Sequence, residues 1–171
     1  MGEDTTMQAH RTLAAGDPDV MRAMIASHPF CAGLDADHVT AMADGASEHT
    51  YAVGDLIIRH GHDATALYLL VEGDVALEIA EPAADPLTVE TLHAGDPLGW
   101  SWLYPPRSWA FDARCLTPAR LLRLDGAHLR GLVDQDPTFG RDLALRVGSV
   151  VVERMQHARA QIVDIRHHDH R

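Results

Sequence analysis

The residues best suited to contact a ligand gather in one short stretch, GWSWLYPPRSWAFDAR, which spans residues 99–114. Within it, Arg107 could pair with phosphate or carboxylate oxygens, because a guanidinium binds such anions strongly. Gly99 could let a ligand approach the backbone closely, because glycine has no side chain. Arg107 could equally form a surface ion pair with an acidic neighbour such as Asp112, and both interpretations stay open.

The same stretch holds all three tryptophans of a chain that is only 5% aromatic. Aromatic side chains either line a pocket or fill a local core. Trp109 and Phe111 alternate along an expected strand, which favours core packing. For Trp100 and Trp102 the pattern supports a pocket and a core equally well.

A second group of residues could hold a metal ion. Gly54, His60 and His62 have the spacing of the first metal-binding motif of cupins, which are also β-rolls. That motif needs a glutamate about four residues later, where this chain has Ala66 or Leu67, and no second motif follows. We therefore expect His60 and His62 to be turn residues rather than metal ligands. We also expect no catalytic residues and no enzymatic activity. A cupin-like metal enzyme is the least favoured alternative.

The composition of the chain excludes several classes of binding partner and location. The chain has 171 residues, 46% hydrophobic, with 14 basic and 25 acidic side chains and a formal net charge of −11. Such a charge repels nucleic acid, so we expect no DNA binding. The acidic N-terminus is no signal peptide, and no apolar run reaches the length of a membrane span. With Cys31 and Cys115 expected to be reduced, half-buried thiols, these features predict a cytoplasmic protein.

Periodicity predicts the order helices, strands, helices. A mobile segment is expected at 1–16, and short helices after Asp17 and Asp35, both good N-caps, open a domain that spans 17–135. A long helix is expected at 136–165 and a flexible tail at 166–171.

The middle of the chain has the period of two that is typical of strands. Val75, Leu77 and Ile79 alternate with Asp74, Ala76 and Glu78, which predicts a strand with one solvated face. Five or more short strands separated by glycine turns predict an α+β fold, mainly β, with a β-roll or jelly roll between the helices.

The long helix repeats apolar residues every three or four positions, at Leu143, Val147, Val150, Val151, Met155, Ala158, Ile162 and Ile165. Such a stripe can pack on the chain's own roll or on a second copy. We expect a homodimer through the segment from Val147 to Ile162.

These features together resemble the cyclic nucleotide-binding domains of the catabolite-activator/Fnr superfamily. The resemblance covers roughly residues 29–165 and rests on the short helix, Tyr51-x-x-Gly54-Asp55, Gly61, Leu67-Tyr68, Gly73 and the segment LHAGDPLG. It implies a β-roll with a phosphate-binding cassette that begins at Gly99. In that family the cassette starts Gly-Glu, the glutamate accepts from the ribose hydroxyl, and a later arginine pairs with the phosphate.

Carried onto this chain, the resemblance implies a ligand-binding set of Leu98, Gly99, Trp100, Ser101, Trp102, Arg107 and Ser108. The cassette is atypical, because Trp100 replaces the glutamate and an indole can only donate a hydrogen bond. It is also two or three residues shorter than the family's.

We therefore expect a stand-alone, non-catalytic sensor or regulatory module for a cyclic nucleotide or another small anionic ligand, without any other cofactor. The alternative is a protein-interaction or assembly module that no longer binds cyclic nucleotide, with an unidentified protein partner. Transcription factors of the superfamily carry a winged helix after the long helix. Because this chain stops at Arg171, no such domain is expected.

Overall fold

The structure is a computed structural model that describes residues 11–12, 17–80 and 84–168, with side-chain burial described for 17–80 and 84–160. Most of the segment 1–16 that was predicted to be mobile, and residues 169–171 of the predicted tail, lie outside these ranges.

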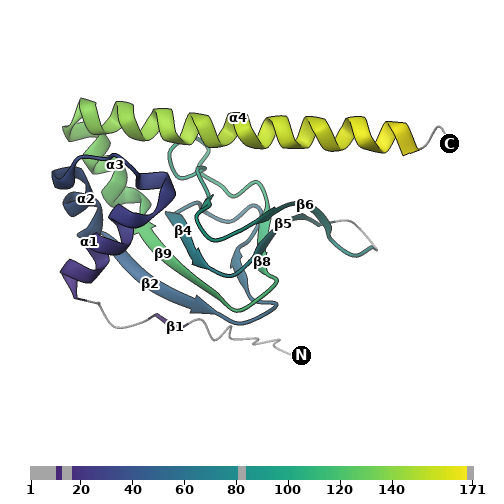
Figure 1. The fold of residues 1–171 in the computed structure, drawn as a ribbon, viewed down its shortest axis with the longest axis horizontal. Coiled ribbons are helices and arrows are strands. Elements are labelled where there is room, and N and C mark those ends of the chain that lie inside the picture. The colour runs from purple at the N-terminus through teal and green to yellow at the C-terminus, as the bar shows by residue number, and fades with distance from the viewer. Residues whose placement is uncertain (1–10, 13–16, 81–83, 169–171) are drawn as a thin grey trace.

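Two antiparallel sheets form the β-roll, as the sequence predicts (Figure 1). The first has the order β1-β2-β9-β4-β7, formed by β1 (Arg11–Thr12), β2 (Ala46–Tyr51), β9 (Ala119–Asp125), β4 (Ala66–Glu72) and β7 (Pro97–Leu98). The second has the order β3-β8-β5-β6, formed by β3 (Leu56–Ile58), β8 (Asp112–Cys115), β5 (Val75–Ile79) and β6 (Leu87–Leu92). The predicted fold class, a mainly β α+β roll with flanking helices, is confirmed.

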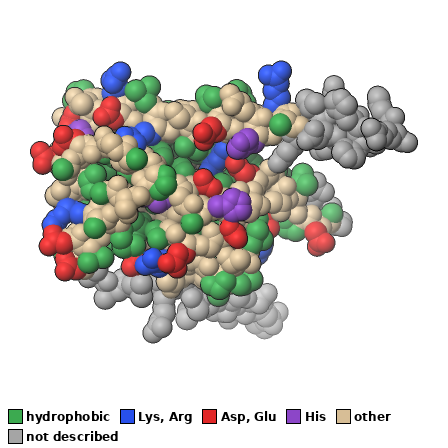
Figure 2. Space-filling view, in the orientation of Figure 1, with side chains coloured by type: hydrophobic (Ala, Val, Ile, Leu, Met, Phe, Trp, Pro, Cys, Tyr) green, Lys and Arg blue, Asp and Glu red, His purple; other side chains and the backbone are tan. Residues whose placement is uncertain are grey.

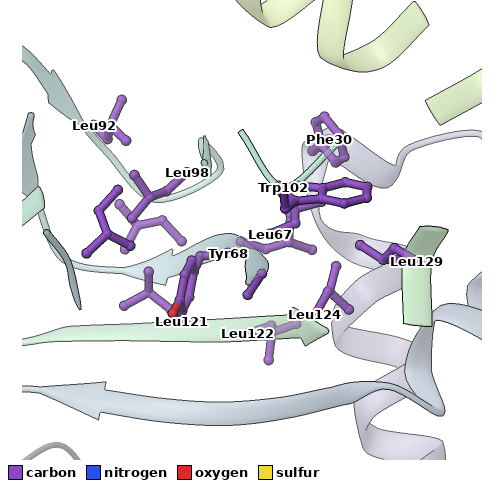
Figure 3. Packing of buried hydrophobic residues seen from close by; sticks show 14 of the residues in the cluster. Phe30, Leu67, Tyr68, Leu92, Leu98, Trp102, Leu121, Leu122, Leu124 and Leu129 are labelled. Atoms are coloured by element: carbon purple, nitrogen blue, oxygen red, sulfur yellow. The ribbon is translucent and has the colours of Figure 1, made fainter. Parts of the chain in front are cut away.

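The hydrophobic core is built around β4 and β9. Every residue from Ala66 to Leu70 is buried, and consecutive residues of a strand point to opposite faces, so both faces of β4 are covered. Figure 3 shows Leu67, Leu122 and Leu124 packing together, with Leu129 of helix α3 (Gly126–Gln135) beside them. This continuous core fixes the strands that carry the cassette.

The N-terminal helices form where the cap residues predict. Helix α1 (Pro18–Ser27) is capped by Asp17, whose carboxylate accepts from the Asp19 N–H at 2.9 Å. Helix α2 (Ala36–Ala43) is capped in the same way by Asp35. A short 3-10 helix, η1 (Pro29–Cys31), connects them. Both N-caps satisfy amide groups that the first helical turn leaves unpaired.

The prediction that β5 has a solvated face is wrong. Ala76 and Glu78 are buried, whereas Ile79 at the strand end is 43% exposed. Strand β5 lies between β8 and β6, and Arg114 of β8 pairs with Glu78, Nε to Oε2, at 3.0 Å. This ion pair compensates the burial of the carboxylate, so a charged residue occupies a position that alternation alone assigns to solvent.

Helix α4 (Pro137–His168) begins at the predicted Asp136-Pro137 step and runs along the whole molecule (Figure 1). Asp136 accepts from the amides of the first turn and from His38 Nε2 at 2.8 Å, and the His38 contact is the main reason that the pKa of its carboxyl is lowered. The helix extends to His168, three residues past its predicted end.

The two halves of α4 differ in what they contact. Phe139, Leu143 and Val147 are buried against the domain, which confirms packing on the chain's own roll for this part. Val152 and Met155 are exposed, at 48% and 63%. Because Val147 is already buried within its own chain, only the later part of the predicted dimer segment remains available to a partner.

His28 provides a test of the packing between η1 and β4. Its ring is buried; Nε2 donates to the Leu70 carbonyl at 3.2 Å, and Nδ1 accepts from the Phe30 N–H at 3.3 Å. Burial is the main reason that the pKa of His28 is lowered from 6.5. The unfolded chain therefore binds more protons than the folded one below about pH 6.5, and the free energy of unfolding should fall as the pH decreases through that value.

Urea unfolding at pH 7.5 and at pH 5.5 measures this effect. We expect His28→Asn, which cannot be protonated, to lose less stability than the wild type over the same interval. Comparing the two proteins removes the contribution of the other titrating groups. An equal loss in both would contradict a buried, neutral His28.

Candidate ligand-binding site

Gly99 follows β7 and lies where two chain segments come into close contact. Its φ is +84°, a left-handed conformation that side chains disfavour. A Cβ added there would lie only 2.6 Å from Cζ3 of Trp109. The glycine that the resemblance assigns to ligand approach is therefore covered by an indole of the same chain.

The cavity beside Gly99 is small, with a volume of about 40 Å³. Pockets for small molecules usually measure about 300–1,000 Å³, whereas 40 Å³ has room for only a few water molecules. The cavity is lined by Ile58, Leu77, Leu98, Gly99, Trp100, Ser101, Trp109, Ala110, Phe111 and Arg154. Its walls are mainly apolar, and its charged lining residue, Arg154, belongs to α4.

Arg154 lines this cavity from the side of α4. Its guanidinium carbon lies 4.6 Å from the ring centroid of Trp100, a cation–π contact. Nη2 donates to the Pro97 carbonyl at 2.6 Å, and Nε lies 3.2 Å from Oε2 of Glu90. Burial lowers the pKa of Arg154, and Glu90 and then Asp96 oppose that shift. Figure 2 shows acidic, arginine and histidine side chains meeting just below α4.

The structure separates the seven residues predicted to contact a ligand. Leu98, Gly99, Trp100 and Ser101 line the cavity. Trp102, Arg107 and Ser108 do not line it.

Trp102 is fully buried elsewhere, beside Phe30 and Leu67 (Figure 3). Its carbonyl accepts from Arg130 Nη1 at 2.9 Å, which ties the loop to α3. Trp109 is also buried, as the core interpretation predicts, although one side of its ring faces the cavity.

Arg107 has an exposed side chain and a φ of +55°. Its carbonyl accepts from the Ala64 N–H at 2.8 Å, so backbone contacts hold this part of the loop. The Asp112 carboxylate, considered above as a partner for Arg107, accepts instead from the backbone N–H of His60 at 2.7 Å. Ligand contact by Arg107 stays a prediction.

Arg154 and its partner Glu90 are charged residues at this site that the sequence did not single out. Arg154 stood among the polar positions between apolar repeats of the helix, with no local signal to distinguish it from its neighbours. It reaches Trp100 only because α4 crosses the roll at this point. An indication was available in principle, because arginine is the side chain most suited to stacking on tryptophan.

The cysteines and the turn histidines lie outside the cavity beside Gly99. Cys31 and Cys115 are buried and unpaired, more deeply than predicted, and burial raises the pKa of each thiol to about 12. His60 and His62 lie at an exposed turn. Within residues 11–12, 17–80 and 84–168, no three His, Cys, Asp or Glu side chains come close enough to hold a metal ion. None of the helices in those ranges has the length and apolar character to cross a bilayer.

Comparison with solved structures supports the fold. A protein from Geobacter metallireducens assigned as cyclic nucleotide-binding has a TM-score of 0.70 and 26% identity, over 82% of this chain and 98% of that one. A cyclic nucleotide-binding domain from Methylobacillus flagellatus has a TM-score of 0.77 and 15% identity, over 91% and 88%. The regulatory domain of Toxoplasma gondii protein kinase A, crystallised with cAMP, has a TM-score of 0.66 and 19% identity, over 78% and 49%.

Sequence comparison identifies the family. A curated protein from Rhodopseudomonas palustris, assigned as a potassium channel, is 27% identical over 121 residues, which is 70% of this chain. The chain spans only 29% of that relative's length. The model of the cyclic nucleotide-binding domain matches residues 48–136, more than half of the chain. The match includes most of the β-roll and the cassette just described, and the chain therefore belongs to the cyclic nucleotide-binding domain family.

Proposed function

We propose that this protein is a non-catalytic regulatory module with an atypical cassette that does not accept cAMP or cGMP in the family's usual manner. The observation that carries the proposal is the volume of about 40 Å³ beside Gly99. The rings of Trp100 and Trp109 and the guanidinium of Arg154 line this small cavity, which supports a cassette with too little room for a cyclic nucleotide.

Hydrogen bonding supports the same proposal. The family's cassette offers a carboxylate to the ribose, whereas Trp100 offers only an N–H. A buried hydroxyl that loses its acceptor costs about 1–3 kcal/mol. Arg107, the residue matched to the phosphate-binding arginine, has its side chain in solvent rather than in the cavity. A nucleotide would therefore need both a larger space and new partners.

Calorimetric titration with cAMP and cGMP tests the proposal. We expect no binding below millimolar concentration for the wild type. Trp100→Ala should enlarge the cavity and tighten binding by at least about tenfold. Tyr104→Ala is the matched control, since Tyr104 belongs to the same loop but is 49% exposed and lies outside the cavity. Micromolar binding by the wild type would refute a closed cassette.

A second candidate function is a protein-interaction or assembly module. The observation in its favour is the exposed apolar part of α4, where Val151, Val152 and Met155 are 38%, 48% and 63% exposed. The homodimer, an unidentified protein partner, the lack of a cofactor and a cytoplasmic location stay predictions in both cases.

A further inference from the structure

A groove of about 490 Å³ lies between helix α1 and the sheet that contains β4 and β9. None of its lining residues lines the cavity beside Gly99, so the two sites are separate. The groove has the volume of an ordinary small-molecule site, which the cavity does not have. The apolar part of its lining consists of Val20, Met24, Pro29, Leu70 and Val71.

Helix α1 leaves part of this sheet uncovered. The N-terminal helices gather at the end of the roll where β9 runs into α3 (Figure 1). Val71 and Arg120 lie toward the other end of β4 and β9, and both are only partly buried. On the α1 side of the groove, Val20 is 54% exposed. Apolar side chains that are open to water in one concave place indicate a binding site more strongly than isolated ones do.

The uncharged polar side chains of the lining are already bonded within the chain. Nε2 of His28 donates to the Leu70 carbonyl, and its Nδ1 accepts from the Phe30 N–H. The Ser27 hydroxyl donates to the Met24 carbonyl at 3.0 Å. A ligand in this groove would find few groups that need a hydrogen-bond partner, so most of its contacts must be apolar.

Arg120 is the charged residue of the lining, and its charge is offset by neighbours. Nη1 donates to Oε1 of Glu48 at 3.0 Å, and Nη2 donates to Oε1 of Glu72 at 2.9 Å. Because these carboxylates and that of Asp96, next to Gly95 in the chain, outnumber the guanidinium, an anionic ligand would be repelled. The two bonds also hold the planar guanidinium in place, and a guanidinium stacks favourably on the electron-rich face of an aromatic ring.

We propose that this groove binds a small, neutral aromatic molecule. Its ring stacks on the Arg120 guanidinium and packs between Val20 and Val71. Met24 supplies a thioether, which makes favourable contacts with aromatic rings. This site goes beyond the proposed function, which concerns the cassette.

Calorimetry on the full chain with two bicyclic alcohols tests the proposal: 2-naphthol and its saturated analogue, decahydro-2-naphthol. The two alcohols are neutral and share one carbon skeleton, so a difference between their affinities reports stacking rather than burial. We expect 2-naphthol to bind with one molecule per chain and at least about threefold more tightly than the saturated alcohol. The anion 2-naphthoate should bind more weakly than 2-naphthol, because the carboxylates around Arg120 repel it.

Arg120→Lys separates the stacking contact from the charge. Lysine keeps the positive charge that the two carboxylates require, but it has no planar group to stack on a ring. We expect this variant to bind 2-naphthol no more tightly than the saturated alcohol, whose own affinity should stay the same. An unchanged preference for 2-naphthol, or an equal loss of affinity for both alcohols, would overturn the contact assigned to Arg120.

Val20→Asp tests the location of the site at an exposed position in the first turn of α1, where an acidic residue suits the helix. It should abolish 2-naphthol binding, whereas Leu145→Asp, 56% exposed on α4 and outside the groove, should leave binding unchanged. Failure of 2-naphthol to bind the wild type, or equal binding to both aspartate variants, would overturn the proposal. So would a dimer that dissociates in Val20→Asp while 2-naphthol fails to bind, because a second copy would then occupy the groove.

Discussion

Replacing Gly99 by alanine should lower the free energy of unfolding by about 2–5 kcal/mol. Two causes add. A side chain at φ +84° costs about 1–2 kcal/mol, and the new methyl group would lie 2.6 Å from the buried ring of Trp109. Because the ring is packed on the cassette backbone, it cannot move aside without opening the core. Equilibrium unfolding in urea measures the loss.

Gly61→Ala is the matched control. Gly61 has a similar φ of +78° but nothing within 4 Å of the added methyl, so it should show only the backbone cost, about 1–2 kcal/mol. In a double-mutant cycle, Trp109→Leu should recover part of the loss caused by Gly99→Ala, since the smaller side chain vacates the space. Purely additive effects would mean that Trp109 does not occupy the position above Gly99.

Replacing Trp102 by alanine should cost about 3–5 kcal/mol of unfolding free energy. Its side chain is fully buried and lies beside Phe30 and Leu67. Its Nε1 has no hydrogen-bond partner among the described residues. Trp102→Phe should therefore be considerably milder, because it keeps most of the buried surface and removes an unpaired donor.

Tyr104→Ala controls for effects of the loop, because Tyr104 is two residues away and exposed. It should change stability by less than about 0.5 kcal/mol. If Trp102→Ala left stability unchanged, Trp102 would not be a core residue. The prediction that Trp102 contacts a ligand would then be favoured again.

The three tryptophans thus have three different surroundings. Trp102 belongs to the core, Trp109 packs on Gly99, and Trp100 stacks with Arg154. Among the three, only Trp100 combines partial exposure with a charged neighbour, and it lines the cavity beside Gly99.

The sequence by itself determined the elements and the family of this protein. Caps at Asp17, Asp35 and Asp136 are local signals, because a side chain bonds amides two or three residues away. Turn glycines act in the same way, since a positive φ is a property of one residue. The order and spacing of these local signals are also what made the β-roll recognisable.

Only the tertiary structure decided what the cassette contains. Arg154 meets Trp100 across 54 residues of sequence because α4 crosses the roll there, and no local pattern encodes that crossing. Arg107 faces solvent because backbone contacts with Tyr104 and Ala64 set the course of its loop. Such contacts depend on how whole elements pack, so residue type and spacing identified the site's location but not the side chains that occupy it.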